Sequence, residues 1–73
     1  MKFSVIFSFV APPGSGTSHL DTFREWRRFA PLIEALGYHG LHVTEHHFQA
    51  DGFLPSPLVA LAQAAGLTQR VKL

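Results

Sequence analysis

The stretch Gly-Leu-His-Val-Thr-Glu-His-His-Phe, residues 40–48, decides how this chain folds. Residues 40–46 predict a β-strand, and the glycine and prolines within residues 48–57 predict the loop that follows it. The Glu-His-His-Phe sequence at residues 45–48 therefore falls where a strand ends. Because α/β folds bind their ligands at the carboxyl ends of strands, the remaining elements must establish whether this fold is α/β.

A first strand is expected over residues 3–10, which are apolar at nearly every position, as in a parallel strand covered on both faces. The two prolines and two glycines of residues 11–18 predict a loop. That loop lacks the Gly-x-Gly-x-x-Gly and Gly-Lys-[Ser/Thr] patterns, so we do not expect it to hold a phosphate.

A helix is expected over residues 21–36, where one apolar stripe recurs at three- and four-residue spacing. The stripe consists of Phe23, Trp26, Ala30, Ile33 and Leu36. Ser18 or Asp21 can cap the start of this helix, and Gly37 supplies a left-handed end. Pro31 conflicts with a regular helix because it lacks an N–H group, so we expect a kink there or a division into two helices.

A second helix is expected over residues 58–68, with Ser56 as its N-cap and Pro57 at its first position. Residues 71–73 then predict the beginning of a third strand. The order strand, helix, strand, helix, strand indicates parallel strands joined by right-handed crossovers. We therefore expect the first two strands to pair in parallel, with the first helix as their crossover.

Length and composition indicate that more protein covers this segment. The chain has 73 residues, of which 47% are hydrophobic and 15% are charged. A small free-standing domain carries about 25–35% charged residues on its surface, and a parallel sheet needs cover on both faces. We therefore interpret residues 1–73 as an N-terminal fragment, which alone would expose open strand edges and self-associate.

Charge and cysteine content exclude several classes of partner. The net charge is +1, and Asp21 and Glu25 lie among the arginines of the first helix, so no nucleic-acid partner is expected. No apolar run approaches the roughly 20 residues of a membrane span, and residues 1–10 do not resemble a secretory signal. The chain has no cysteine, which fits a reducing compartment, and we expect a cytoplasmic location.

Five short motifs follow one another along the chain: Met1-Lys2-Phe3, Leu36-Gly37-Tyr38, Glu45-His46-His47-Phe48, Ser56-Pro57-Leu58 and Thr68-Gln69-Arg70-Val71-Lys72-Leu73. In their order and spacing they resemble the start of the bacterial-luciferase-like flavin monooxygenases. The chain departs from the family at His42, where an aromatic residue is usual, and at Pro31. The resemblance implies the N-terminal βαβα(β) portion of a TIM-like (β/α)8 barrel, incomplete in this chain.

The same resemblance implies a monooxygenase that uses reduced flavin mononucleotide (FMN), or alternatively a deazaflavin coenzyme, and O2 to oxidise a small organic substrate. In the luciferases proper, the first histidine of the Glu-His-His-Phe motif is a catalytic acid/base beside the flavin, and the resemblance implies that role for His46. We expect a dimer in the full-length form, and no activity from residues 1–73 alone. The substrate and the flavin phosphate would be held by later loops.

The residues around His46 leave other roles open. An imidazole suits proton transfer near neutral pH, although a histidine that only holds the following loop is the alternative. If the strand continues, His47 and Glu45 share the opposite, helix-facing side and support the site, with the carboxylate paired to a basic group. Phe48 is a core residue or a pocket wall, and Asp51 adds a carboxylate to the loop.

A metal site is the remaining chemical alternative. His42, Thr44 and His46 alternate onto one strand face, but the chain has no cysteine and no His-Glu-x-x-His spacing on a helix. We therefore expect no metal. Two functional alternatives stay open beside the enzyme: a non-catalytic truncated remnant or docking fragment of such a barrel, and a small histidine-based metal-binding module.

Overall fold

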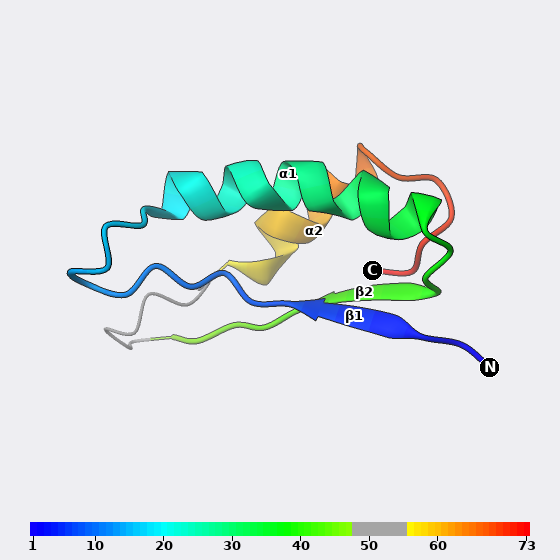
Figure 1. The fold of residues 1–73 in the computed structure, drawn as a ribbon, viewed down its shortest axis with the longest axis horizontal. Helices are drawn as coiled ribbons and strands as arrows, with labels where there is room; N and C mark the ends of the chain where they lie inside the picture. Colours follow the sequence, from blue (N-terminus) through cyan, green and yellow to red (C-terminus); the bar gives the residue numbers. More distant parts are fainter. Residues whose placement is uncertain (48–55) are drawn as a thin grey trace.

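The computed structural model describes residues 1–47 and 56–73. Its elements follow the order strand, helix, strand, helix (Figure 1). They are β1 (Ser4–Phe7), α1 (His19–Ala35), β2 (Gly40–Val43) and α2 (Pro57–Ala65). β1 and β2 pair in parallel, with Ser4 opposite Gly40 and Phe7 opposite Val43. The predicted parallel pair with α1 as its crossover is confirmed.

Both strands are shorter than predicted from residues 3–10 and 40–46, since each contains four residues. Phe9 lies beyond β1 and is nevertheless completely buried. The apolar run therefore predicts which residues are buried under the helices. It does not predict where the strand ends, because a strand ends where its hydrogen bonds to the partner strand end.

The start of α1 is a capping box. Ser18 is the N-cap, and its hydroxyl accepts a hydrogen bond from the Asp21 backbone N–H at 3.1 Å. The Asp21 carboxylate in turn accepts from the Ser18 N–H at 3.0 Å, and this bond holds the pKa of the Asp21 carboxyl below its usual range. Both residues predicted as alternative caps thus act together at this terminus.

The end of α1 is a Schellman motif. Gly37 adopts φ +87°, and its N–H donates to the Glu34 carbonyl at 3.0 Å. The Tyr38 N–H donates to the Ile33 carbonyl at 3.3 Å. A residue with a side chain is strained at this φ, so the predicted role of Gly37 as the left-handed end is confirmed.

Pro31 does not divide α1, which is one helix of 17 residues in the structure. The alternative of two helices is wrong. A proline within a helix deprives the carbonyl four residues earlier of its partner, and that residue is the exposed Arg27. Water can hydrate a carbonyl on the exposed side, which lowers the cost of the missing bond.

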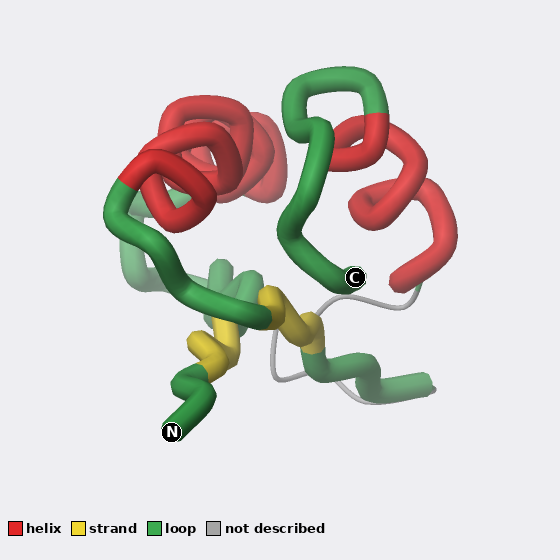
Figure 2. The backbone as a smooth tube through the Cα atoms, turned by 90° about the vertical axis from the view of Figure 1, so that its right-hand side faces the viewer, coloured by secondary structure: helices red, strands yellow, loops and turns green. Residues whose placement is uncertain are grey.

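The helices lie on one side of the sheet (Figure 2), and the core fills the space between these layers. The buried apolar residues are Phe9, Trp26, Ala30, Ile33, Leu41, Ala60, Ala64 and Val71. Trp26 connects the two helices, because its indole N–H donates to the Ala60 carbonyl of α2 at 2.8 Å. The predicted stripe of α1 is correct except at Leu36, which is 64% exposed because it lies at the C-cap.

The region after α2 begins to extend the sheet. α2 ends before the predicted residue 68, because Gly66 is its C-cap. Ser56 is the N-cap as expected, although its side chain makes no capping hydrogen bond. Lys72 then forms a parallel bridge to Gly40, so the predicted third strand starts on the far edge of β2 from β1.

The two faces of the sheet differ. Val5 and Phe7 of β1 pack against the core under the helices, whereas Ile6 is 66% exposed on the opposite face. His42 of β2, the register partner of Ile6, is also exposed. We refer to this second face as the open face. No helix in the described part of the chain is long and apolar enough to cross a membrane.

Candidate active site

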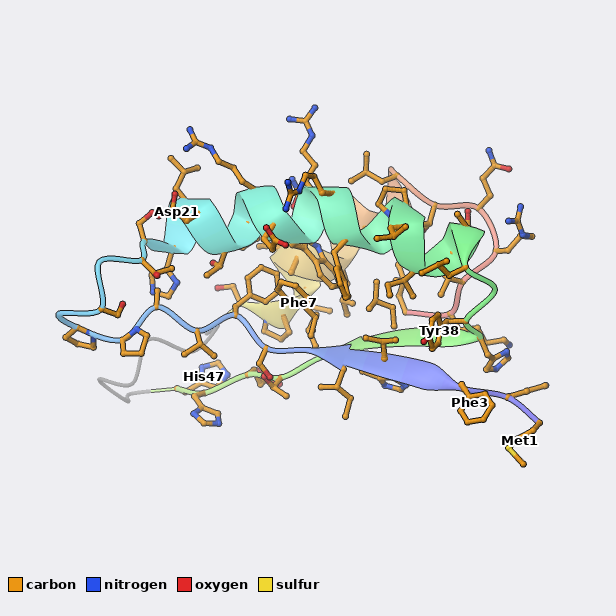
Figure 3. The ribbon with its side chains drawn as sticks, viewed as in Figure 1. Met1, Phe3, Phe7, Asp21, Tyr38 and His47 are labelled. Carbon is orange, nitrogen blue, oxygen red and sulfur yellow. The ribbon has the colours of Figure 1, made fainter. Side chains whose placement is uncertain are left out.

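Glu45, His46 and His47 lie one residue beyond β2, after Thr44, at the carboxyl end of the parallel pair. In Figure 3 the labelled His47 lies beyond β2, whereas Phe3 and Met1 lie at the amino end of the sheet. All three motif residues are exposed. The candidate residues Phe48 and Asp51 lie outside the described residues 1–47 and 56–73.

Glu45 and His47 contact each other. The His47 Nε2 atom lies 2.5 Å from the Glu45 Oε2 atom, and the two side chains are 53% and 50% exposed. A carboxylate that accepts a hydrogen bond from one imidazole nitrogen determines which nitrogen carries the proton. The structure therefore pairs two of the predicted site residues, and the helix layer does not bury His47.

The strand ladder does not reach the motif. Val43, the last residue of β2, packs against the core, and His42 lies on the open face. Beyond Val43 the pairing with β1 no longer dictates the alternation of side chains. Thr44 has a buried hydroxyl oxygen without a hydrogen-bond partner among the described residues.

Gly40 of β2 lies against the Ser4 side chain of β1. A Cβ atom on Gly40 would lie 2.7 Å from the Ser4 hydroxyl oxygen and 3.5 Å from His42 Nε2. The Ser4 and His42 side chains thus lie over the Gly40 backbone. Sequence reasoning treated Gly40 only as the start of a strand, and the register that places Ser4 opposite it could not be derived from the chain alone.

Glu34 is a second residue whose role the sequence analysis missed. Its Oε2 atom accepts hydrogen bonds from three successive backbone N–H groups, those of Gln69, Arg70 and Val71, at 2.9, 2.5 and 2.9 Å. These bonds, led by the one from Arg70, hold the pKa of the Glu34 carboxyl below its usual range. The carboxylate therefore fastens the segment before the third strand to the end of α1.

A sequence signal for this contact exists. Glu34 lies in the last turn of α1, where the helix dipole disfavours a negative charge. The residues three and four positions away are Ala30, Pro31, Gly37 and Tyr38, none of them basic. A carboxylate in the last turn of a helix, with no basic residue three or four positions away, indicates a partner from another part of the fold.

A hollow in the surface lies at the other end of the sheet. Its lining includes Phe3, Tyr38 and Arg70. This is the amino end of the strands, and in barrels of parallel strands that end contributes stability, whereas the opposite end carries the chemistry. Within residues 1–47 and 56–73, no group of three or more histidine, aspartate or glutamate side chains could hold a metal ion.

Comparison with known proteins gives the class to which this chain belongs. Residues 1–73 match the luciferase-like monooxygenase family. The chain is 34% identical over 73 residues to the uncharacterized protein y4vJ of Sinorhizobium fredii (strain NBRC 101917 / NGR234), covering all of this chain and 20% of that protein. The chain belongs to the luciferase-like monooxygenase family, and the resemblance seen in its motifs is confirmed.

The fold supports the same assignment. The structure is similar to the crystal structure of apo-MsnO8, with a TM-score of 0.81 and 26% sequence identity over 96% of this chain and 21% of that one. The β-α-β-α segment with parallel strands thus corresponds to part of a luciferase-like TIM barrel. The chain spans about one fifth of the length of the proteins it matches.

Proposed function

We propose that this chain supplies the first two β/α units of a flavin-dependent oxidoreductase that oxidises a small organic substrate with reduced FMN and O2. One observation carries the proposal: the Glu-His-His motif of a luciferase-like monooxygenase chain lies exposed at the carboxyl end of a parallel β-strand. That end of the strands is where barrels of this class build their active sites. Activity belongs to the complete barrel.

The residues present fit a place beside a flavin. Reduced FMN, when bound, supplies the electrons for the reduction of O2. An exposed imidazole at the mouth of the barrel can accept or donate a proton at a ring nitrogen, which is the role we assign to His46. Glu45, His47 and Phe48 would support it. These side chains are equally compatible with a deazaflavin coenzyme.

The test uses a barrel chimera, in which residues 1–73 replace the matching segment of a family member whose substrate is known. We expect His46→Ala to lower its turnover with reduced FMN, O2 and that substrate by about 10²–10⁴-fold, the usual contribution of general acid–base catalysis. FMN binding, measured by fluorescence titration, should change much less. Unchanged turnover in His46→Ala would exclude His46 as the acid/base.

The open face of the sheet favours a second candidate, a non-catalytic docking fragment of such a barrel. Ile6 on this face is 66% exposed, which leaves apolar surface for the rest of such a barrel to cover. The coding sequence downstream of Leu73 distinguishes the two candidates. A continuation in frame for about 200 residues completes a barrel and supports the enzyme, whereas a stop codon supports the docking fragment.

A further inference from the structure

We propose that the hollow at the amino end of the sheet binds a small carboxylate with an aromatic body. Arg70 and Lys2 hold the charge of this ligand, and Phe3 and Tyr38 contact its ring. The hollow is separate from the Glu-His-His motif, which follows the opposite end of the strands. The inference therefore goes beyond the proposed function and does not depend on it.

The hollow is formed where three parts of the chain meet. They are residues 1–3 before β1, residues 34–39 between α1 and β2, and residues 70–71 before the third strand. Its volume is about 920 Å³, and small-molecule sites span roughly 300–1,000 Å³. The His39 N–H donates to the Phe3 carbonyl at 2.8 Å, and the Lys72 N–H donates to the His39 carbonyl at 3.0 Å. Backbone hydrogen bonds thus join the three parts of the wall.

Aromatic and aliphatic side chains form the apolar part of the lining. Phe3, Leu36 and Tyr38 all line the hollow, and all three are exposed. In Figure 3 the labelled Phe3 and Tyr38 lie at this end of the sheet, away from His47. Exposed rings at a concave surface favour a ligand that has an aromatic ring of its own.

Arg70 has hydrogen-bond donors to spare for an anion. Its guanidinium lies 4.0 Å from Glu34 Oε1, a long distance for an ion pair, and its side chain is 72% exposed. The Glu34 carboxylate is held instead by three backbone N–H groups at its Oε2 atom. A guanidinium has five N–H donors and can bind a carboxylate through two parallel hydrogen bonds.

Lys2 adds a second positive charge to the hollow. Among residues 1–47 and 56–73, the ion pairs join Arg24 with Asp21, Arg28 with Glu25, His47 with Glu45 and Arg70 with Glu34. Lys2 belongs to none of these pairs. The lining therefore has the charges of Lys2 and Arg70 against one carboxylate, that of Glu34, and this excess favours an anionic ligand.

The first experiment titrates the ¹⁵N-labelled 73-residue chain with benzoate at constant ionic strength. Benzoate should shift the amide signals of residues 36–39 and 70–71, with a Kd of about 1 mM, as expected for so small a ligand. Benzyl alcohol has the ring without the charge, and acetate has the charge without the ring. Both should bind at least about 5-fold more weakly. Equal binding of either one, or shifts confined to other residues, would overturn the proposal.

Two variants test the cations. Arg70→Gln and Lys2→Gln should each lower the affinity for benzoate by about 2- to 5-fold, the range expected for exposed charges. The bonds to Glu34 come from backbone N–H groups, so Arg70→Gln leaves that segment in place. Arg28→Gln is the matched control, because it removes an exposed guanidinium of α1 outside the hollow. An equal loss in Arg28→Gln would show non-specific attraction and refute the site.

The barrel chimera keeps the proposal testable if the 73-residue chain self-associates. Saturation-transfer difference NMR measures benzoate binding to the chimera and to its Arg70→Gln variant. Binding that Arg70→Gln weakens supports the site. If the chimera binds no benzoate, the rest of the barrel fills the hollow and the proposal is wrong; if Arg70→Gln binds as tightly as the parent, benzoate binds elsewhere and the proposal is equally wrong. These measurements need no turnover, so the result for His46→Ala decides the proposed function separately.

Discussion

Trp26 offers the sharpest test of how the two helices are held on the sheet. It is fully buried, its ring centroid lies 5.2 Å from that of Phe7 and 5.3 Å from that of Phe9, and its indole N–H donates to Ala60. Replacing Trp26 by Ala removes the aromatic contacts and the hydrogen bond together. We expect the free energy of unfolding to fall by about 3–5 kcal/mol, as for other large-to-small changes at buried aromatic residues.

A second variant separates the hydrogen bond from the packing. Trp26→Phe keeps an aromatic ring next to β1 but leaves the Ala60 carbonyl without the indole donor. That carbonyl belongs to α2 and can still accept the N–H of Ala64 within the helix. The loss should therefore be about 1 kcal/mol for the bond plus about 1 kcal/mol for the smaller apolar surface.

The assay is urea denaturation of the 73-residue chain at low micromolar concentration, followed by far-UV circular dichroism. Trp26 is the only tryptophan, so the parent's fluorescence gives an independent report of its burial. Leu32→Ala is the matched control on the exposed side of α1, since Leu32 is 50% exposed. If Trp26→Ala were no more destabilising than Leu32→Ala, or equal to Trp26→Phe, the packing argument would be refuted.

Three other predictions address the remaining contacts. Because the pKa of Glu34 is lowered in the folded chain, its contribution to stability should be complete above the unfolded value near 4.5 and lost as pH falls through the folded pKa. Thermal melts from pH 2 to 7 should show a larger loss in the parent and in Glu25→Gln than in the less stable Glu34→Gln, which keeps only the acid-sensitive contribution of Asp21. Gly40→Ala should lower the melting temperature by crowding Ser4, and adding Ser4→Gly should restore part of it; no recovery in the double variant would argue against that clash. Sedimentation velocity should show self-association of the isolated chain that Ile6→Ser on the open face reduces, and a monodisperse parent monomer would contradict the exposed-face argument.

Much of the fold could be predicted from local sequence. The capping box of Ser18 and Asp21 and the left-handed end at Gly37 depend on residues within a few positions of each other, so their spacing is visible in the chain. The alternation of strand and helix likewise predicts the parallel pair, because right-handed crossovers leave few other arrangements. The motif that ends at residue 48 indicated the family for the same reason, since its residues are contiguous.

The ends of the strands, and the positions of α1 that departed from expectation, depended on tertiary contacts. A strand ends where its pairing with the partner strand ends. The apolar run that includes Phe9 therefore predicted burial correctly, but it predicted a longer strand than the structure contains. Pro31 is accommodated within one continuous α1, where the carbonyl four residues earlier belongs to the exposed Arg27. Leu36 continues the spacing of the helical stripe, but it is exposed because it lies at the C-cap of α1.

For the candidate site, too, the sequence determined one part of the arrangement and the tertiary structure another. The sequence by itself determined which side chains follow β2, because their order along the chain is covalent. Only the tertiary structure decided that Glu45 contacts His47, that Glu34 binds three N–H groups some 35 residues away in the chain, and that Gly40 lies beneath Ser4. Each of these contacts depends on strand register or on the docking of one element against another, and those are determined by the packing of the whole core.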